Sequence, residues 1–310
     1  MSIRLVKETA RRLLKECDTF VFDCDGVLWK GADVIPGAPL MIKHLKAAGI
    51  RTLFLTNNSM KSRSDYAERF AGMGFEGVAE EDIISSAYVA SEYLAAQLPA
   101  GSGVFVCGAS GIYRELEKVG LKPCKPFEEE YKGKAWDLHE VESIPLDNNV
   151  KAVLCGLDIH MSYPKIATAS RYIKNNRAMF VATNADSTLP VKTGFLPGAG
   201  SCVSSISRVT GQEPIVTGKP SVDPLASILN VAAQLYDRKR SSNVAPFHPS
   251  RALMVGDRVD TDMMFGRQAG MRTLLVLSGV ATEEHVQEHT SEIDYVTSDL
   301  GEFVHYISDV

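Results

Sequence analysis

The feature that most constrains this chain is a short apolar run ending in two closely spaced aspartates. Residues 19–22 read as one buried strand, and Asp23-Cys24-Asp25-Gly26 follows at once. Because residues i and i+2 of an extended chain point the same way, Asp23 and Asp25 can converge on one phosphate or one metal ion. A turn without chemical function is the simpler alternative, since Asp and Gly are common turn formers.

The same order of strand and polar end returns further along the chain. Residues 39–48 suit a helix, and the strand expected at residues 51–55 ends in Thr56-Asn57-Asn58-Ser59. Short strand, helix and strand connections predict a parallel pair, whose ligands lie beyond the carboxyl ends of the strands. Thr56 and Asn57 are therefore expected beside Asp23, where a hydroxyl and backbone amides suit phosphoryl oxygens. A Ser/Asn-rich turn is the alternative for this segment.

The alternation of strands and helices breaks once and then restarts. Helices are expected at residues 62–73 and 84–98, before the Pro- and Gly-rich residues 99–103. After the break we expect strands at 104–107, 152–154 and 179–182, and helices at 111–119 and 163–175. This pattern predicts an α/β domain over residues 101–212, inserted into a core domain of residues 1–100 and 213–310.

Polar residues also follow the strands expected in the inserted domain. They are Asp158, His160, Asn184 and Asp186. Each could face a substrate, because functional residues concentrate in loops, but solvated loop residues are the commoner case.

Two more strand ends in the last third of the chain carry charged residues. A strand at residues 214–217 precedes Lys219, and a strand at residues 252–255 precedes Asp257 and Asp262. Lys219 would place an ammonium near a bound phosphate. Asp257 would add a third carboxylate, with Asp262 as its orienting partner, in an oxygen-rich site suited to Mg²⁺. If the four strands are parallel and end at one edge of one sheet, the polar residues at their ends would together form a phosphoryl-transfer site.

Composition limits the partners and the compartment. A net charge of −5 gives no basic surface for nucleic acid, and no apolar stretch approaches the roughly 20 residues of a membrane span. Residues 1–17 are charged and do not resemble a signal peptide. The six cysteines lack metal-ligand spacing, which is typical of a reduced cytoplasmic protein. Among them, Cys24 between the two aspartates is either a buried small residue or a site where oxidation would inhibit.

In order and spacing, four motifs together resemble those of the haloacid dehalogenase superfamily. They are Asp23-x-Asp25-Gly-Val, Leu55-Thr56-Asn57-Asn58, Gly218-Lys219-Pro220 and Gly256-Asp257-x-x-x-x-Asp262. The insertion is similar to the large α/β cap of the branch that contains phosphoglycolate, pyridoxal and 4-nitrophenyl phosphatases. The resemblance implies an α/β fold: a doubly wound, Rossmann-like parallel-sheet core with an inserted α/β cap domain.

The resemblance also implies a mechanism. Asp23 would attack phosphorus, and Asp25 would protonate the leaving alcohol and then activate water. Mg²⁺ would be held by Asp23, the main-chain carbonyl of Asp25 and Asp257, while Thr56 and Lys219 bind the phosphoryl oxygens. Asp262 would complete the metal site. Further substrate contacts are expected from Gly26, Asn57, Asn58, Asp158, His160 and Asn184.

The cap sequence favours one substrate class over another. In pyridoxal phosphatases a histidine precedes the proline equivalent to Pro190, whereas Leu189 stands here. The resemblance thus implies phosphoglycolate or a similar small phosphate monoester, with 4-nitrophenyl phosphatase activity, ahead of pyridoxal phosphate. It also implies a possible homodimer through the cap. A phosphomutase and a non-catalytic binding protein on the same fold stay open as alternatives.

Overall fold

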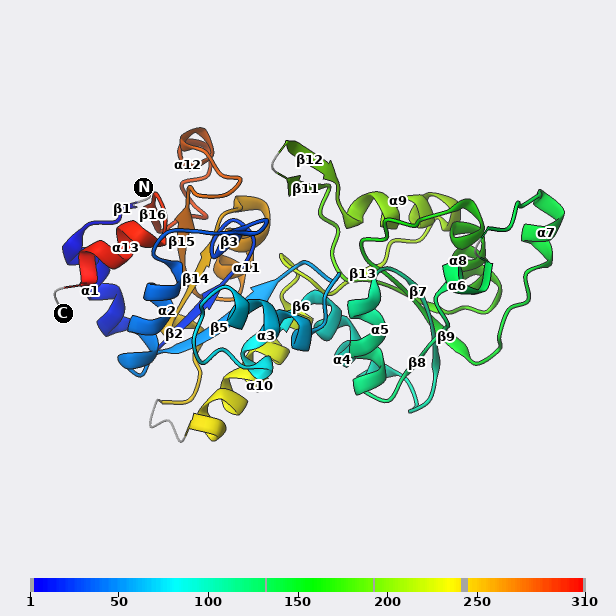
Figure 1. Ribbon diagram of the computed structural model, residues 1–310, viewed down its shortest axis with the longest axis horizontal. Helices are drawn as coiled ribbons and strands as arrows, with labels where there is room; N and C mark the ends of the chain where they lie inside the picture. The colour runs from blue at the N-terminus through cyan, green and yellow to red at the C-terminus, as the bar shows by residue number, and fades with distance from the viewer. Residues whose placement is uncertain (1–2, 132, 192, 241–244, 309–310) are drawn as a thin grey trace.

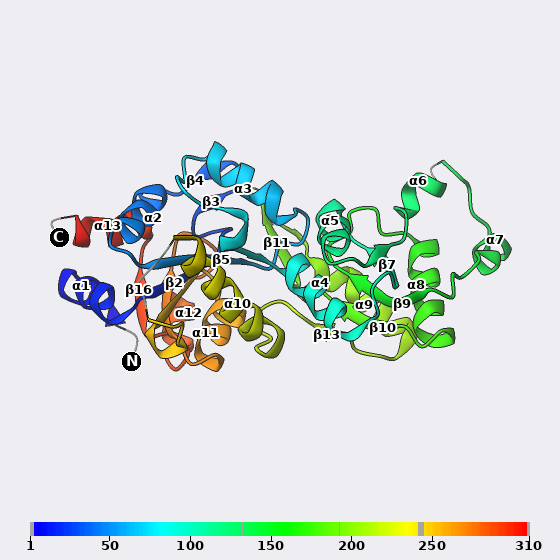
Figure 2. The same cartoon turned by 90° about the horizontal axis from the view of Figure 1, so that it is seen from below.

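The computed structural model describes residues 3–131, 133–191, 193–240 and 245–308, which form two α/β lobes side by side (Figure 1). The chain starts and ends in the larger lobe, and the middle of the chain forms the smaller one (Figures 1 and 2). Within the described ranges, no helix is both long and apolar enough to cross a membrane.

The elements follow one another in three blocks. The first part of the larger lobe contains β1 (Ile3–Arg4), α1 (Lys7–Glu16), β2 (Thr19–Phe22), β3 (Trp29–Lys30), β4 (Asp33–Val34), α2 (Ala38–Ala47), β5 (Arg51–Thr56), α3 (Arg63–Gly72), η1 (Glu80–Asp82), β6 (Ile83–Ser85) and α4 (Ser86–Gln97). The smaller lobe contains β7 (Gly103–Cys107), α5 (Ser110–Lys118), β8 (Lys122–Pro123), α6 (Phe127–Tyr131), α7 (Leu138–Ser143), β9 (Val150–Cys155), α8 (Tyr163–Asn175), β10 (Met179–Ala182), β11 (Thr188–Val191), β12 (Gly194–Pro197), α9 (Ala199–Thr210) and β13 (Ile215–Val216). The chain completes the larger lobe with α10 (Asp223–Arg240), η2 (Pro249–Arg251), β14 (Ala252–Gly256), η3 (Val259–Met263), α11 (Met264–Gln268), β15 (Arg272–Val276), α12 (Glu283–Glu288), β16 (Tyr295–Thr297) and α13 (Leu300–Ile307).

Each lobe is built on a parallel sheet. The larger sheet has the order β1-β16-β15-β14-β2-β5-β6, and the smaller one β13-β10-β9-β7-β8. All neighbouring strands in these two sheets are parallel. Because β2 lies between β14 and β5, the carboxyl ends of these three strands meet at one edge. The predicted fold class is confirmed.

Helices cover both faces of the larger sheet, as the alternation of side chains along its strands requires. Phe20 and Phe22 of β2 pack in a core with residues of α1, α2 and α13. Val21, between them, points to the opposite face and packs with residues of α10 and α11. Strands buried on both faces are mostly apolar, which is why Phe20, Val21 and Phe22 form an uninterrupted apolar run in the sequence.

Helix α4 joins the two lobes. Tyr88 and Val89 pack in the core of the larger lobe, while Ala87 and Leu94 pack against the smaller sheet and α5. With apolar residues around its whole circumference, α4 is almost fully buried over its first half. The lobes are therefore connected by a packed helix and not only by loops.

The prediction that a strand at residues 214–217 belongs to the core sheet is wrong. β13 pairs with β10, so the smaller sheet extends to Val216, beyond the predicted end of the inserted domain at residue 212. Of the four strands predicted to carry polar ends to one edge, three therefore belong to the larger sheet. Lys219 reaches that edge from the segment that returns from the smaller lobe.

Two other differences concern the element boundaries. The helix predicted from residue 84 begins at Ser86, because Ile83–Ser85 form a sixth strand parallel to β5 and Ser85 caps the helix. The antiparallel hairpin of β11 and β12 and the helix α9 were not predicted. The hairpin lies between the lobes, beside the upper edge of the larger one (Figure 1).

Candidate active site

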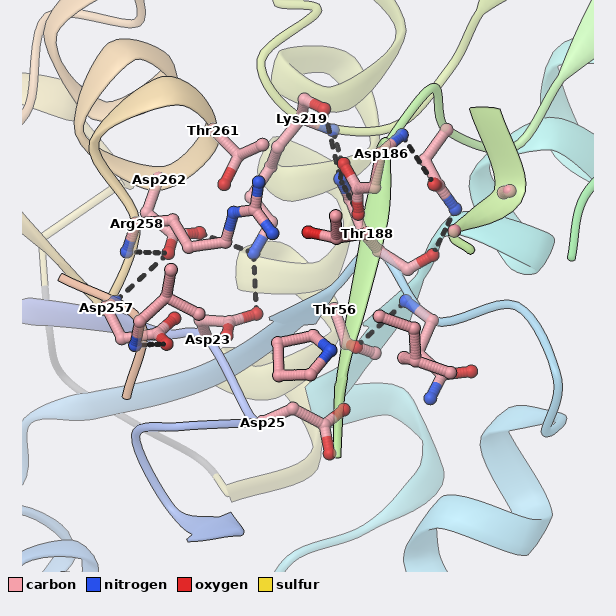
Figure 3. A pocket seen from close by; sticks show the side chains of 18 of the residues that line it. Asp23, Asp25, Thr56, Asp186, Thr188, Lys219, Asp257, Arg258, Thr261 and Asp262 are labelled. Carbon is pink, nitrogen blue, oxygen red and sulfur yellow. Dashed lines mark hydrogen bonds and ion pairs between the residues drawn. The ribbon is translucent and has the colours of Figure 1, made fainter. Parts of the chain in front are cut away.

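A pocket lies at the carboxyl ends of β2, β5 and β14, with its remaining wall supplied by the smaller lobe. Figure 3 shows Asp23, Asp257 and Asp262 at one side of this pocket, and Asp186 and Thr188 at the other. The larger lobe also contributes Asp25, Thr56, Asn57, Asn58 and Lys219. The structure therefore gathers the core residues predicted from the sequence around one cavity.

Three carboxylates crowd together on the core side of the pocket. Asp23, Asp257 and Asp262 each offer an oxygen within 4.8 Å of the others, and all three side chains are buried. Burial, with the neighbouring Asp262, raises the pKa of Asp257 to about 7. Burial also raises the pKa of Asp23 well above its usual value, although Lys219 opposes the effect.

An all-oxygen cluster of this kind fits a hard divalent cation. Such cations bind carboxylate and carbonyl oxygens, and a bound cation would offset the burial and the mutual repulsion that raise these two pKa values. The main-chain N–H of Val280 donates to Asp257 at 2.8 Å, which orients this carboxylate as outer partners orient metal ligands. The residues present therefore fit the expected metal.

Two glycines make room for the Asp257 carboxylate. Gly26 has φ +90°, and a Cβ there would lie 2.2 Å from Oδ2 of Asp257. A Cβ on Gly279 would lie 1.8 Å from the same oxygen. Gly26, predicted to contact substrate, is thus needed for the close approach of the backbone to the acidic cluster. Gly279 was not predicted, since it comes from the loop after β15.

Lys219 is held by three oxygen acceptors. Its buried Nζ donates to Asp23 Oδ1 at 2.6 Å, to Asp262 Oδ1 at 2.7 Å and to the carbonyl of Leu55 at 3.0 Å. Burial alone would lower the pKa of Lys219, but Asp23 and Asp262 raise it above its usual value. The lysine therefore stays protonated and directs positive charge at Asp23.

Both oxygens of Asp262 already have partners. Oδ1 accepts from Lys219, and Oδ2 accepts from the backbone N–H groups of Asp257 and Arg258, each at 3.1 Å. This arrangement suits an orienting residue better than a direct metal ligand. The same carboxylate holds both the lysine and the start of the loop that carries Asp257.

Asp25 stands apart from the acidic cluster. Its Oδ1 accepts a hydrogen bond from the indole Nε1 of Trp29 at 2.8 Å, and in Figure 3 it lies on the lower side of the pocket. The side chain is partly exposed, so water or a leaving group can reach it. Cys24, between the aspartates, is fully buried, and burial together with Asp23 and Asp25 raises its pKa well above the usual value. A buried neutral thiol is a poor nucleophile.

The polar residues at the end of β5 and directly after it make different contacts. Thr56 lines the pocket, and its hydroxyl accepts from the N–H of Asn58 at 3.1 Å. The carboxamide of Asn58 accepts from the N–H of Met60 at 3.0 Å and so closes a turn. Asn57 directs its carboxamide at Lys219 and Asp186. The predicted substrate role thus suits Thr56, while Asn57 and Asn58 also have structural contacts that the sequence did not reveal.

The residues predicted in the inserted domain divide into two groups. Asn184 lines the pocket, as does the neighbouring Asp186. The structure does not bring Asp158 or His160 into it: Asp158 is buried in an ion pair with Lys165 at 2.6 Å, and His160 is exposed. The sequence gave no signal that separates the two groups, because each residue simply follows a strand. Only the packing of the two lobes decides which of these loops faces the pocket.

Arg258 is a pocket residue that was not predicted. It follows Asp257 directly, and its guanidinium donates to Asp260 at 3.1 and 2.8 Å. The hydrogen bonds to Asp260 raise the pKa of Arg258, so the cation persists. The only sequence signal for Arg258 is its position beside a predicted carboxylate.

Comparisons with known proteins agree with this geometry. A haloacid dehalogenase-like hydrolase model matches residues 20–122, and a second model of HAD-like hydrolases matches residues 216–303. Glycerol-3-phosphate phosphatase of Gallus gallus is 38% identical, covering 92% of this chain and 88% of its own. The 4-nitrophenylphosphatase of Schizosaccharomyces pombe is 36% identical, with 94% of each chain covered. Phosphoglycolate phosphatase 2 of Arabidopsis thaliana is 34% identical, covering 95% of this chain and 94% of its own.

A solved structure extends the comparison to three dimensions. Glycerol phosphate phosphatase from Mycobacterium tuberculosis, in complex with magnesium, is 29% identical and superposes with a TM-score of 0.72. The match covers 94% of this chain and 77% of that one. From its sequence relatives and its fold, the chain belongs to the haloacid dehalogenase-like hydrolase family.

Proposed function

We propose that this protein is a Mg²⁺-dependent phosphatase that hydrolyses small phosphate monoesters through an aspartyl-phosphate on Asp23. The observation that carries the proposal is the pairing of a buried Asp23 carboxylate with the Lys219 ammonium, beside the carboxylate of Asp257. The similar proteins compared above are phosphatases by name, which supports the same reaction class.

Each step can be assigned to a side chain of the pocket. A carboxylate oxygen of Asp23 attacks phosphorus while the bond from phosphorus to the ester oxygen breaks, and Asp25 gives its proton to the leaving alkoxide. Asp25 then takes a proton from water as that water attacks phosphorus and the bond to Asp23 breaks. Lys219 and the hydroxyl of Thr56 stabilise negative charge on the phosphoryl oxygens.

The metal site would use three groups of this chain. The carboxylates of Asp23 and Asp257 and the main-chain carbonyl of Asp25 would hold Mg²⁺, with Asp262 orienting the cluster. When bound, the ion supplies positive charge against the phosphoryl oxygens. Lys219 alone leaves the three carboxylates with excess negative charge, which supports the need for that cation.

The smaller lobe, predicted as residues 101–212, acts as a cap that selects the leaving group. Leu157, Leu189 and Pro190 line the pocket from the smaller lobe and give that wall apolar surface. This wall suits a compact leaving group such as glycolate or glycerol, and 4-nitrophenol by apolar contact. Pyridoxal phosphate ranks second, because Leu189 occupies the place where the pyridoxal phosphatases have a histidine.

Assembly and compartment belong to the same proposal. Phe195 and Leu196 of the hairpin are 73% and 53% exposed, which supports a homodimer formed through the cap. All six cysteines are free thiols, which supports a reducing compartment such as the cytoplasm. The molar mass measured by light scattering for the protein and for Phe195→Ser tests the dimer: a monomeric wild type contradicts it.

Phosphate release tests the proposed function. Phosphoglycolate, glycerol phosphate, 4-nitrophenyl phosphate and pyridoxal phosphate are compared with Mg²⁺ and with chelator. We expect chelator-sensitive hydrolysis, with the highest kcat/KM for a small aliphatic ester and none for Asp23→Asn. A preference for pyridoxal phosphate would contradict the role given to Leu189. Isomerised sugar phosphate without free phosphate would indicate a mutase, and no metal-dependent reaction would indicate a binding protein.

A further inference from the structure

We propose that Asp186 of the smaller lobe is a positioning residue, which fixes Lys219 through the carboxamide of Asn57. This inference rests on the proposed function of Lys219 in phosphoryl transfer. It adds a contact between the lobes to the site. Through this contact, the position of the lysine depends on the position of the smaller lobe.

The first step is the contact between Asn57 and the main chain of Lys219. Oδ1 of Asn57 accepts from the N–H of Lys219 at 2.8 Å, and Nδ2 donates to the carbonyl of Lys219 at 3.1 Å. The carboxamide of Asn57 therefore binds both main-chain polar groups of Lys219. The side chain of Lys219 starts from this fixed backbone and reaches Asp23 and Asp262.

The second step is that Asp186 holds this carboxamide in the orientation that the main chain of Lys219 requires. Nδ2 of Asn57 also lies 3.1 Å and 3.3 Å from the two oxygens of Asp186. A carboxylate only accepts hydrogen bonds, so the NH₂ of Asn57 must face it and the oxygen must face the N–H of Lys219. A flipped carboxamide would oppose oxygen to carboxylate and NH₂ to N–H.

The third step is that Asp186 has little freedom to move. Its N–H donates to the carboxamide of Asn184 at 3.1 Å, and Asn184 donates to the carbonyl of Asn57 at 2.7 Å. Its carbonyl accepts from the N–H of Gly200 at 2.9 Å, and a Cβ on Gly198 would lie 2.2 Å from that carbonyl oxygen. The backbone of Asp186 is thus packed against the start of α9. In Figure 3, Lys219 lies between Asp262 and Asp186.

A consequence for catalysis follows from these contacts. The lysine acts on charge that develops at the phosphoryl group, so displacing it should lower kcat more than it raises KM. For Asp186→Ala we expect a fall in kcat of about 10-fold, as for the loss of one charge-assisted hydrogen bond, with KM changed less than about 3-fold. Asp186→Asn should keep kcat within about 3-fold of wild type, because its carboxamide oxygen still accepts from Asn57.

The test is a double-mutant cycle of Asp186→Ala and Asn57→Ala, with Asp186→Asn as the rescue variant. Asp147→Ala is the matched control, since the carboxylate of Asp147 accepts a local bond from the N–H of Asn149 in the smaller lobe and does not line the pocket. If Asp186 acts through Asn57, the double variant should be no slower than Asn57→Ala. Additive losses, an Asp186→Asn enzyme as slow as Asp186→Ala, or an equal loss in Asp147→Ala would overturn the proposal.

A crystal structure of Asp186→Ala separates this inference from the proposed function, because it requires no substrate. We expect the carboxamide of Asn57 to be rotated and the main chain of Lys219 to be displaced, with both unchanged in Asp147→Ala. Wild-type positions of both residues in Asp186→Ala would refute the inference, even if the wild-type enzyme hydrolyses phosphate esters. Displacement of both in a protein without phosphatase activity would refute only the proposed function.

Discussion

Replacing Asp257 by Asn should stabilise the metal-free protein at alkaline pH. The pKa of this carboxyl rises from 3.8 to about 7 in the folded state, so the folded protein holds its proton more tightly than the unfolded chain. The stability that this proton confers is complete below pH 3.8 and is lost as the pH rises through about 7. Above that pH the buried carboxylate destabilises the fold, whereas a neutral carboxamide does not.

The magnitude follows from the size of the shift. Three pKa units correspond to roughly 4 kcal/mol at about pH 8, and the difference falls to roughly 2 kcal/mol at about pH 5. For a domain of this size that is an increase of about 10 °C in Tm for Asp257→Asn at the higher pH. The charged groups near Asp257 that could change this value are Asp23, Asp262, Lys219 and Arg258.

Thermal unfolding in chelator, measured at several pH values, tests this prediction. Asp260→Asn is the control: Asp260 lies three residues after Asp257, in η3, but its pKa is lowered in the folded state, so this variant should not gain stability at alkaline pH. Adding Mg²⁺ should stabilise the wild type more than Asp257→Asn, which has lost a ligand. An Asp257→Asn protein less stable than wild type at alkaline pH in chelator would refute the reasoning.

Three further predictions concern the same site. Asp25→Asn should lower kcat by about 10²- to 10⁴-fold, the usual contribution of proton transfer, while phosphate release keeps its dependence on Mg²⁺ concentration; a large shift in that dependence would make the side chain a ligand. Lys219→Met should lower the free energy of unfolding by about 3–5 kcal/mol, because two buried carboxylates lose their partner, and kcat by about 100-fold or more; unchanged Tm would contradict the buried pairing. A thiol reagent followed by peptide mass spectrometry should label the half-buried Cys124 before the fully buried Cys24, and early labelling of Cys24 would contradict its burial.

Local pattern was enough to predict those elements whose ends are marked in the sequence. β2 and β14 are apolar runs with acidic ends, and α8 begins at the cap Ser162, whose side chain accepts from the N–H of Lys165. The sheet to which β13 belongs could not be predicted this way. Two apolar residues have the same pattern in either sheet, and their partner is set by the register of Ile215 opposite Val181 in the folded lobe.

Helix α9 shows a different limit. Four serines and a threonine lower its intrinsic helix propensity, so the sequence gives no strong local signal. Its stability comes from packing of Cys202, Val203 and Ile206 against the smaller sheet. Tertiary contacts of this kind cannot be read from propensity.

The candidate site also contains residues that local pattern predicts and contacts that it does not predict. Asp23 and Asp257 follow strands, Thr56 ends β5, and Lys219 lies on the segment that returns from the smaller lobe. The structure gathers these four residues around one pocket. The bond between Asn57 and Asp186 joins residues of separate lobes, so no local spacing encodes it. Contacts made across the lobes are what the sequence alone does not supply.

Covalent labelling tests the central claim most directly. The enzyme is mixed with a ³²P-labelled phosphate ester and Mg²⁺, quenched in acid during turnover, and the labelled peptide is identified. The mechanism predicts label on the peptide that contains Asp23 in the wild type, more of it in Asp25→Asn if dephosphorylation is slowed, and none in Asp23→Asn. Rapid phosphate release by the wild type without any protein-bound label, or label that persists in Asp23→Asn, would contradict Asp23 as the nucleophile.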